Sequence, residues 1–308
     1  MASHRPMGFV VLVSMLAVLS ACHAARNDHQ AGSALRDDAI TVGSFNFAES
    51  ELLAEVYSQA LTDGGYEVRR AFGLGPREFV VPALQSGLVE LVPEYAGTAV
   101  EFLSRGASEP VADLGATHDA LERTLVGSRV TALASAPARD ANAVVVTERT
   151  ADRLGLDRIS DLATVASGLS FGGPPECPNR RFCLLGLEAT YGLTFEEFVP
   201  LDAGGPLTRQ ALENGNVDVG LLFTTDPALA EDGLVALEDD RDLQPAENVT
   251  PLVNREVVDR WGNQLVELVD GVSRDLTTQD LLDLNAQVES GRASIAAAAA
   301  AWLEERAA

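Results

Sequence analysis

The sequence has no lysine, since every one of its 22 basic residues is arginine. This absence excludes a lysine Schiff base, a lysine general base and the lysine of a phosphate-binding P-loop. Histidine is almost as scarce: three of the four histidines lie in the first 29 residues, which leaves only His118 for a catalytic triad or a zinc site. We therefore expect neither a metal site nor a cofactor.

Positive charge is also in short supply. The 22 basic residues face 46 acidic ones, for a net charge of −24, and such a chain repels phosphate backbones. Nucleic acid is therefore excluded as a partner. We interpret the acidity as a surface property and expect few carboxylates in the functional site. At roughly 100–200 residues per domain, 308 residues suggest about two domains.

No hydrophobic run is long enough to span a bilayer. The longest begins at Met7 and ends at Ala21, about 15 residues against the ~20 that a spanning helix needs. With Arg5 before it and small residues at its end, it has the pattern of a secretory signal peptide over residues 1–21.

The signal ends in Leu19-Ser20-Ala21-Cys22, which resembles the bacterial lipobox. This predicts lipidation of Cys22, a flexible tether over residues 22–38, and an extracytoplasmic protein anchored by lipid to the outer face of the cytoplasmic membrane. An ordinary signal peptide with a chance cysteine is the alternative.

The other two cysteines are Cys177 and Cys183. In an oxidising compartment, two cysteines this close are most simply a small disulfide loop. A metal site is the alternative, but it would need further ligands and no histidine is nearby.

From residue 39 the hydrophobic pattern alternates between strands and helices. Residues 39–43, 66–72 and 88–92 read as strands, and helices are expected over 48–63 and from Pro76 to Gly87. Such alternation predicts a parallel sheet with crossover helices. Further strands are expected at 142–147 and 248–254. We expect a second lobe over 141–245, inserted into a first lobe made of 39–140 and 246–308, with two crossing segments as a hinge.

One segment recurs. Residues 83–91 are echoed by 211–219, an offset of 128 that also relates Tyr95 to Phe223. Each segment ends a helix, turns at a glycine and enters a strand. Because ligands bind beyond the carboxyl ends of strands in open α/β sheets, we expect each lobe to offer one aromatic ring to a shared cleft.

Several motifs occur together in a recognisable order. They are Val42-Gly43-Ser44-Phe45-Asn46-Phe47-Ala48-Glu49, Pro93-Glu94-Tyr95-Ala96-Gly97-Thr98, Arg180, Gly186-Leu187, Tyr191-Gly192, Val217-Asp218-Val219 and Thr224-Thr225-Asp226. This set resembles the substrate-binding lipoproteins of osmoprotectant ABC transporters, the glycine betaine, choline and carnitine type. The resemblance implies a type II periplasmic-binding-protein fold, a two-lobe venus flytrap that binds a small zwitterionic or cationic ligand without catalysis. It also implies a monomer that delivers its ligand to an ABC permease and, indirectly, to its ATPase.

The resemblance also implies the ligand-binding residues. Tyr95 and Phe223 fall at cage positions, where aromatic faces attract a quaternary ammonium. Arg180 falls at the arginine that takes the ligand carboxylate. Asn46 and Thr98 are expected as polar companions, and Thr225 belongs to the last motif.

Some positions depart from the family pattern. Phe45 stands where lysine is frequent, and Asn142 and Leu184 replace expected aromatics. With only four tyrosines in the chain, a four-tyrosine cage cannot form. Phe45 and Phe182 are candidate substitutes. We therefore hypothesise a related but different ligand, such as a bulkier amine.

Two alternatives remain at this point. A secreted two-lobe enzyme would have to work through carboxylates, since lysine and histidine are nearly absent. A binding protein that senses its ligand without transport would share the same lobes. Arg77 is expected at the surface, with a second anion contact as its alternative role.

Overall fold

The computed structural model describes residues 38–108, 111–231 and 233–307. The chain divides into two units, Met1–Ala39 and Ile40–Ala308, and the fold described below belongs to the second. The expected signal peptide, the lipidated Cys22 and nearly all of the expected tether lie outside the described residues.

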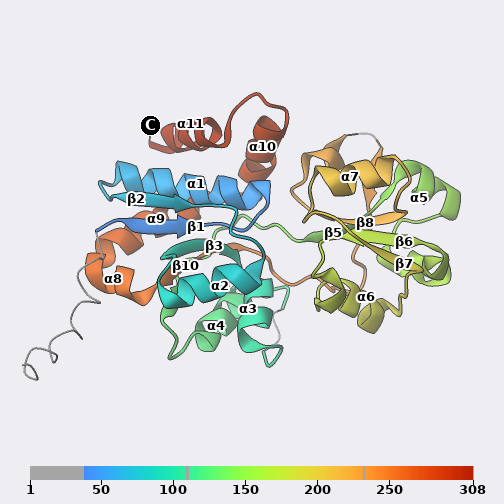
Figure 1. Cartoon of the computed structure of the whole chain (residues 1–308), viewed down its shortest axis with the longest axis horizontal. Coiled ribbons are helices and arrows are strands. Elements are labelled where there is room, and N and C mark those ends of the chain that lie inside the picture. The colour runs from blue at the N-terminus through green and yellow to red at the C-terminus, as the bar shows by residue number, and fades with distance from the viewer. Residues whose placement is uncertain (1–37, 109–110, 232, 308) are drawn as a thin grey trace, which may run out of the picture. The chain divides into compact units, whose positions relative to one another are not determined.

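The first sheet has five strands in the order β2-β1-β3-β10-β4. Strands β1, β2 and β3 are parallel, whereas β10 runs antiparallel to both β3 and β4. The strands are β1 (Ile40–Gly43), β2 (Val68–Ala71), β3 (Leu91–Tyr95), β4 (Val130–Ala132) and β10 (Val249–Asn254). Around them lie α1 (Ala48–Asp63), α2 (Arg77–Ser86), α3 (Ala96–Ser104), α4 (Leu114–Thr124), α8 (Arg255–Trp261), α9 (Asn263–Asp275), α10 (Thr278–Glu289) and α11 (Ile295–Ala307) (Figure 1).

The second sheet also has five strands, in the order β7-β6-β8-β5-β9. They are β5 (Asn142–Thr147), β6 (Ser170–Gly173), β7 (Glu197–Pro200), β8 (Val219–Phe223) and β9 (Leu234–Ala236). Its helices are α5 (Glu148–Leu154), α6 (Leu184–Tyr191) and α7 (Pro206–Glu213), with short 3-10 turns that include η3 (Cys177–Asn179) and η4 (Pro227–Ala230). All five strands lie within residues 141–245; the exact lobe boundaries stay a prediction.

The chain passes between the two sheets twice, from β4 to β5 and from β9 back to β10. The two crossing segments lie side by side, because Arg139 forms an antiparallel bridge with Asn248, and the Asp140 N–H donates to the Glu247 carbonyl at 3.0 Å. A pair of adjacent crossings is the arrangement that a hinge requires.

Each sheet has its own core, because its strands bury both faces. Along β5 the side chains alternate: Val144 and Val146 pack on one face of the second sheet, and Ala143 and Val145 pack on the other. The long core of the first sheet extends to Trp302, which lets the C-terminal helix α11 pack against α1 (Figure 1).

Most of the expected elements appear at their expected positions. Helix α1 and strand β5 have the expected bounds. The expected strand at 88–92 is wrong by three residues, since β3 begins at Leu91. The physical reason is the end of α2, where the N–H groups of Leu88 and Val89 still donate to the Ala83 carbonyl.

The internal echo is structural. Strands β3 and β8 match residue for residue at the offset of 128. In the second copy the N–H groups of Asn216 and Val217 donate to the Ala211 carbonyl, as Leu88 and Val89 do to Ala83. Both turns use a glycine with positive φ, Gly87 at 77° and Gly215 at 70°.

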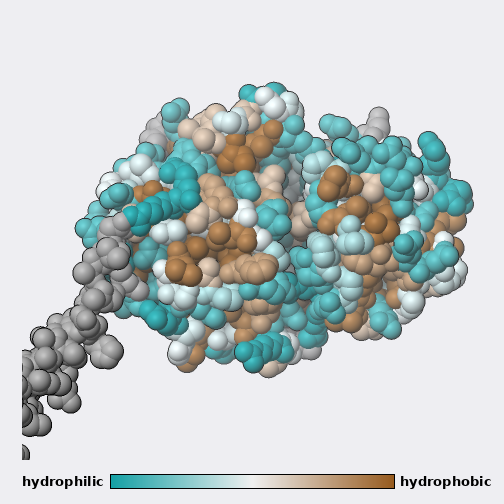
Figure 2. Space-filling model, in the orientation of Figure 1, coloured by the Kyte–Doolittle hydropathy of each residue, from teal (hydrophilic) through white to brown (hydrophobic). Residues whose placement is uncertain are grey.

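Exposed apolar side chains occur at equivalent points of the two copies. Figure 2 shows hydrophobic residues gathered over α2 on the face that it presents. In the first turn of α2, Phe79 is 65% exposed, and Leu207, its counterpart in α7, is 57% exposed. The similarity of the two copies therefore extends from the strands to the surface of the helices.

Candidate ligand site

A cavity of about 130 Å³, here called the aromatic cavity, is lined by residues that follow strands of both sheets. It brings together all but one of the residues expected to bind the ligand: Phe45, Asn46, Tyr95, Thr98, Asn142, Arg180 and Phe223. An apolar cavity of about 150 Å³ holds benzene. The aromatic cavity therefore has room for a small ligand, and the bulkier amine suggested by the sequence stays a prediction.

Phe47 is the centre of the aromatic cluster. Its ring centroid lies 6.0 Å from that of Phe45, 6.0 Å from that of Tyr95 and 5.1 Å from that of Phe223. Sequence reasoning missed Phe47 as a site residue, although its motif was recognised. The available signal was its position in the turn between β1 and α1, which ends beyond the carboxyl edge of the sheet.

The rings reach the cavity because of where their strands end. Tyr95 is the last residue of β3 and Phe223 the last of β8, so both stand at carboxyl ends of strands. Gly204 makes room for the Phe223 ring, because a Cβ atom at that position would lie 2.5 Å from it. Gly204 also has a φ of 62°, which favours glycine.

The hydroxyl group of Tyr95 is already used. It donates to Glu49 Oε1 at 2.7 Å, and the residue is only 6% exposed. Burial, together with the nearby carboxylates of Glu49 and Asp140, raises the pKa of Tyr95 well above its usual value. Tyr95 therefore presents its ring rather than its hydroxyl group to the cavity.

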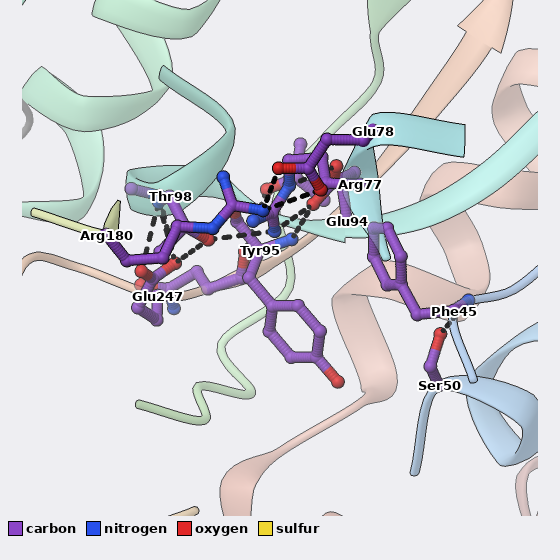
Figure 3. Close-up of polar contacts among 12 residues, drawn as sticks. Phe45, Ser50, Arg77, Glu78, Glu94, Tyr95, Thr98, Arg180 and Glu247 are labelled. Carbon is purple, nitrogen blue, oxygen red and sulfur yellow. Dashed lines mark hydrogen bonds and ion pairs between the residues drawn. The ribbon is translucent and has the colours of Figure 1, made fainter. Parts of the chain in front are cut away.

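Arg77 is not a surface residue, so the expectation for it was wrong. Its guanidinium donates to both carboxylate oxygens of Glu94, at 2.9 and 2.8 Å, and to the Thr98 hydroxyl at 2.9 Å (Figure 3). Its central carbon lies 5.1 Å from the centroid of the Phe45 ring. The ion pair with buried Glu94 allows the charged Arg77 side chain to line the cavity. Arg77 also packs against the ring of Phe45, which the sequence offered as a wall of the aromatic cage.

Glu247, from the second crossing segment, caps helix α3. Its carboxylate accepts from the Gly97 N–H at 3.1 Å and from the Thr98 N–H at 3.0 Å (Figure 3). The N-cap residue of α3 makes no side-chain cap, so these bonds satisfy N–H groups that would otherwise lack partners. Burial raises the pKa of Glu247 to about 8, although the Thr98 N–H and Arg77 act in the opposite direction.

Arg180 lies in the loop closed by the disulfide. Cys177 and Cys183 are joined, with their Cα atoms 5.3 Å apart. Arg180 Nη2 donates to both carboxylate oxygens of Glu78, each at 2.8 Å, and the guanidinium carbon lies 5.4 Å from the Phe102 ring centroid (Figure 3). Arg180 therefore already pairs with a carboxylate, but this carboxylate is that of Glu78 in the first turn of α2.

Asn142 and Thr225 have structural partners. The Asn142 amide donates to the Phe182 carbonyl at 2.9 Å. Thr225 is 1% exposed, and its hydroxyl donates to Glu49 Oε2 at 2.5 Å. Thr225 lines a second cavity of about 420 Å³ rather than the aromatic cavity. Of the predicted residues, it is the one that does not line the aromatic cavity, although Asn46 and Phe223 line both cavities.

The expectation of few carboxylates at the site was wrong. Asp140, Glu101, Glu176 and Glu247 line the aromatic cavity, against Arg77, Arg180 and Arg181. Burial and the neighbouring Glu49 raise the pKa of Asp140 well above its usual value. Glu101 comes from helix α3, and the other three come from separate connecting segments, so their convergence is a property of the tertiary structure. Among the described residues, no cluster of histidine, cysteine and acidic side chains could hold a metal ion.

Comparison with known proteins assigns the family. Residues 38–305 match the substrate-binding domain of ABC-type glycine betaine transport systems. The chain belongs to this family. It is 28% identical to a glycine-betaine-binding protein of Pseudomonas aeruginosa over 94% of both chains. It is 26% identical to the glycine betaine-binding protein YehZ of Escherichia coli, over 81% of this chain and 84% of that one.

Solved structures agree on the fold. A crystal structure of a glycine betaine/carnitine/choline ABC transporter protein superposes with a TM-score of 0.67 at 22% identity, covering 86% of this chain and 98% of that chain. The prediction of a two-lobe periplasmic-binding-protein fold is confirmed. The family also confirms an extracytoplasmic solute-binding protein that works with an ABC permease, and its members are not enzymes.

Proposed function

We propose that the protein binds a small quaternary amine in the aromatic cavity. The observation that supports this most directly is the cluster of Phe47, Tyr95 and Phe223. Two of these rings carry no hydrogen-bonding group, and the hydroxyl of Tyr95 is committed to Glu49. Such a wall attracts a cation through its ring faces but offers no acceptor to the N–H groups of a primary ammonium, and an N–H group left unpaired against the buried rings is costly. A fully substituted ammonium avoids this cost.

Arg180 is the proposed partner for an anionic end of the ligand. A ligand carboxylate would replace Glu78 on the guanidinium, exchanging one charge-assisted pair for another. The net binding free energy that a zwitterion gains from Arg180 is therefore the difference between its own ion pair with Arg180 and the Arg180–Glu78 pair that it displaces. A cation without a carboxylate leaves the Arg180–Glu78 pair intact. Both glycine betaine and choline fit these requirements, and relatives named for glycine betaine support the former.

We also propose the location and state of the mature protein. The lipobox-like end of the signal supports a lipid anchor on Cys22 at the outer face of the cytoplasmic membrane, and we expect a monomer. Within the part of the chain that the structure describes, helices are too short or too polar to span a bilayer. Ligand would be delivered to a permease powered by a cytoplasmic ATPase.

A calorimetric screen tests the ligand class. The mature protein is titrated with glycine betaine, choline, carnitine, proline and a primary amine of similar size, such as ethanolamine. The proposal expects binding of at least one quaternary amine and at least tenfold weaker binding of ethanolamine. Arg180→Gln should weaken glycine betaine more than choline. Binding of ethanolamine as tight as choline would contradict the proposal.

A transport assay separates an importer from a sensor. Membrane vesicles that contain the permease and ATPase encoded by neighbouring genes should accumulate radiolabelled ligand only when the binding protein is added. Ligand binding without any stimulation of uptake or of ATP hydrolysis would favour the sensor.

A further inference from the structure

Glu49 is a buried carboxylate that receives hydrogen bonds from three separate parts of the fold. It lies in the first turn of α1 and is 5% exposed. Its Oε1 accepts from the Tyr95 hydroxyl at 2.7 Å, and its Oε2 accepts from the Thr225 hydroxyl at 2.5 Å and from Asn285 Nδ2 at 2.6 Å. Sequence reasoning assigned no role to this residue.

Two of the three donors connect Glu49 to opposite sides of the site. Tyr95 ends β3 of the first sheet, and its ring is a wall of the aromatic cavity. Thr225 follows β8 of the second sheet by two residues. Its contact with Glu49 joins positions 176 residues apart. One carboxylate therefore touches both the ring that would hold the ligand and the segment that must move if the sheets separate.

We propose that Glu49 is a positioning residue that couples the orientation of the Tyr95 ring to the approach of the second sheet. This inference rests on the proposed function of the aromatic cavity. A buried carboxylate needs its donors, and loss of Thr225 would leave Oε2 with fewer of them. A ligand that holds the ring in place keeps Glu49 facing Thr225. Because coupling between sites is reciprocal, contact with Thr225 strengthens the hold on the ligand by the same factor.

Asp140, from the first crossing segment, also binds the turn after β8, but its role differs from that of Glu49. It accepts from the Thr224 hydroxyl and from the Thr225 N–H, both at 3.0 Å. It therefore holds the Thr224 side chain and the Thr225 backbone, whereas the short bond of the Thr225 hydroxyl, at 2.5 Å, is to Glu49. The contact with Tyr95 belongs to Glu49, and this difference makes the coupling testable with single hydroxyl groups.

A double-mutant cycle on Tyr95→Phe and Thr225→Val measures the coupling. Each change removes one hydroxyl group, and Tyr95→Phe keeps the ring. Stopped-flow dissociation of choline and of glycine betaine is measured for the wild type, both single variants and the double variant. We expect each single variant to release ligand roughly two- to tenfold faster, and the double variant to be no faster than the faster single variant. Dissociation rates that multiply in the double variant would overturn the inference.

Two further variants separate positioning from simple stability. Ser170→Ala also removes a hydroxyl that donates to a carboxylate, Asp218 at 2.9 Å, but neither of these residues lines the aromatic cavity or the second cavity. It should lower the melting temperature and leave dissociation unchanged. Glu49→Gln has one acceptor oxygen in place of two and should speed release of both ligands. Wild-type dissociation rates in folded Glu49→Gln would refute the role of Glu49. Failure of the wild type to bind any quaternary amine would overturn the proposed function and the coupling together.

Discussion

Phe47 should contribute more to ligand affinity than any other ring, and Phe47→Leu tests this. The substitution keeps apolar bulk but removes the aromatic face that stands between Tyr95 and Phe223. A cation–π contact contributes about 0.5 kcal/mol at an exposed site and about 2 kcal/mol when desolvated. Since Phe47 is half-buried, we expect a loss of about 1–2 kcal/mol, or roughly a five- to thirtyfold rise in Kd for choline.

The assay compares choline with its neutral carbon analogue, 3,3-dimethylbutan-1-ol, which has the same shape without the charge. Isothermal titration of wild type and Phe47→Leu with both compounds isolates the electrostatic part of binding. Phe45→Leu serves as the matched control, because Arg77 already engages that ring. Equal losses for choline and the alcohol, or a loss in Phe45→Leu as large as in Phe47→Leu, would refute the reasoning.

Three further changes have expected outcomes. Gly97→Ala would place a Cβ atom 2.4 Å from Pro245 Cγ, so it should push the second crossing segment away from helix α3. Calorimetry should show a lower melting temperature and weaker ligand binding. An unchanged affinity would contradict the idea that close packing of Gly97 on Pro245 supports the ligand site. The raised pKa of Glu247 lets the folded protein keep a proton that the unfolded chain loses, so the free energy of unfolding should fall as pH rises from about 4.5 to about 8. Urea unfolding of Glu247→Gln should show a smaller fall over this pH range than the wild type. Parallel stability curves for the two proteins would contradict this prediction. Replacing Cys177 and Cys183 by serine should reduce the free energy of unfolding by about 2 kcal/mol. The double substitution should also weaken the binding of glycine betaine more than that of choline, because Arg180 lies in the loop that the disulfide closes. Equal weakening for the two ligands would argue against binding of the ligand carboxylate by Arg180.

The sequence predicted the site best where it repeats itself. Tyr95 and Phe223 were paired by an offset alone, and both stand at the carboxyl ends of equivalent strands. This succeeded because strand, turn and helix are local patterns, so two copies of the pattern place their last residues alike. Phe47 lies outside the repeat, in a turn, and had no such signal.

The sequence could not predict which partners the charged side chains would find. Arg77 looked like a surface arginine, but Glu94, 17 residues away, pairs with it in the interior. Glu247 caps α3 across a separation of 149 residues. An ion pair or a cap is decided by which groups meet, and that depends on the packing of whole elements.

The sequence by itself determined the α/β alternation, the two sheets, the internal repeat and the family. These follow from hydrophobic periodicity, turn residues and short motifs, which act within a few residues of one another. Only the tertiary structure decided that Phe47 is the centre of the aromatic cluster, that Glu78 pairs with Arg180, and that Glu49 links Tyr95 to Thr225. These contacts join residues from 46 to 176 positions apart. The physical reason is that buried polar groups must find partners in space, and local sequence does not reveal which distant donor will be near.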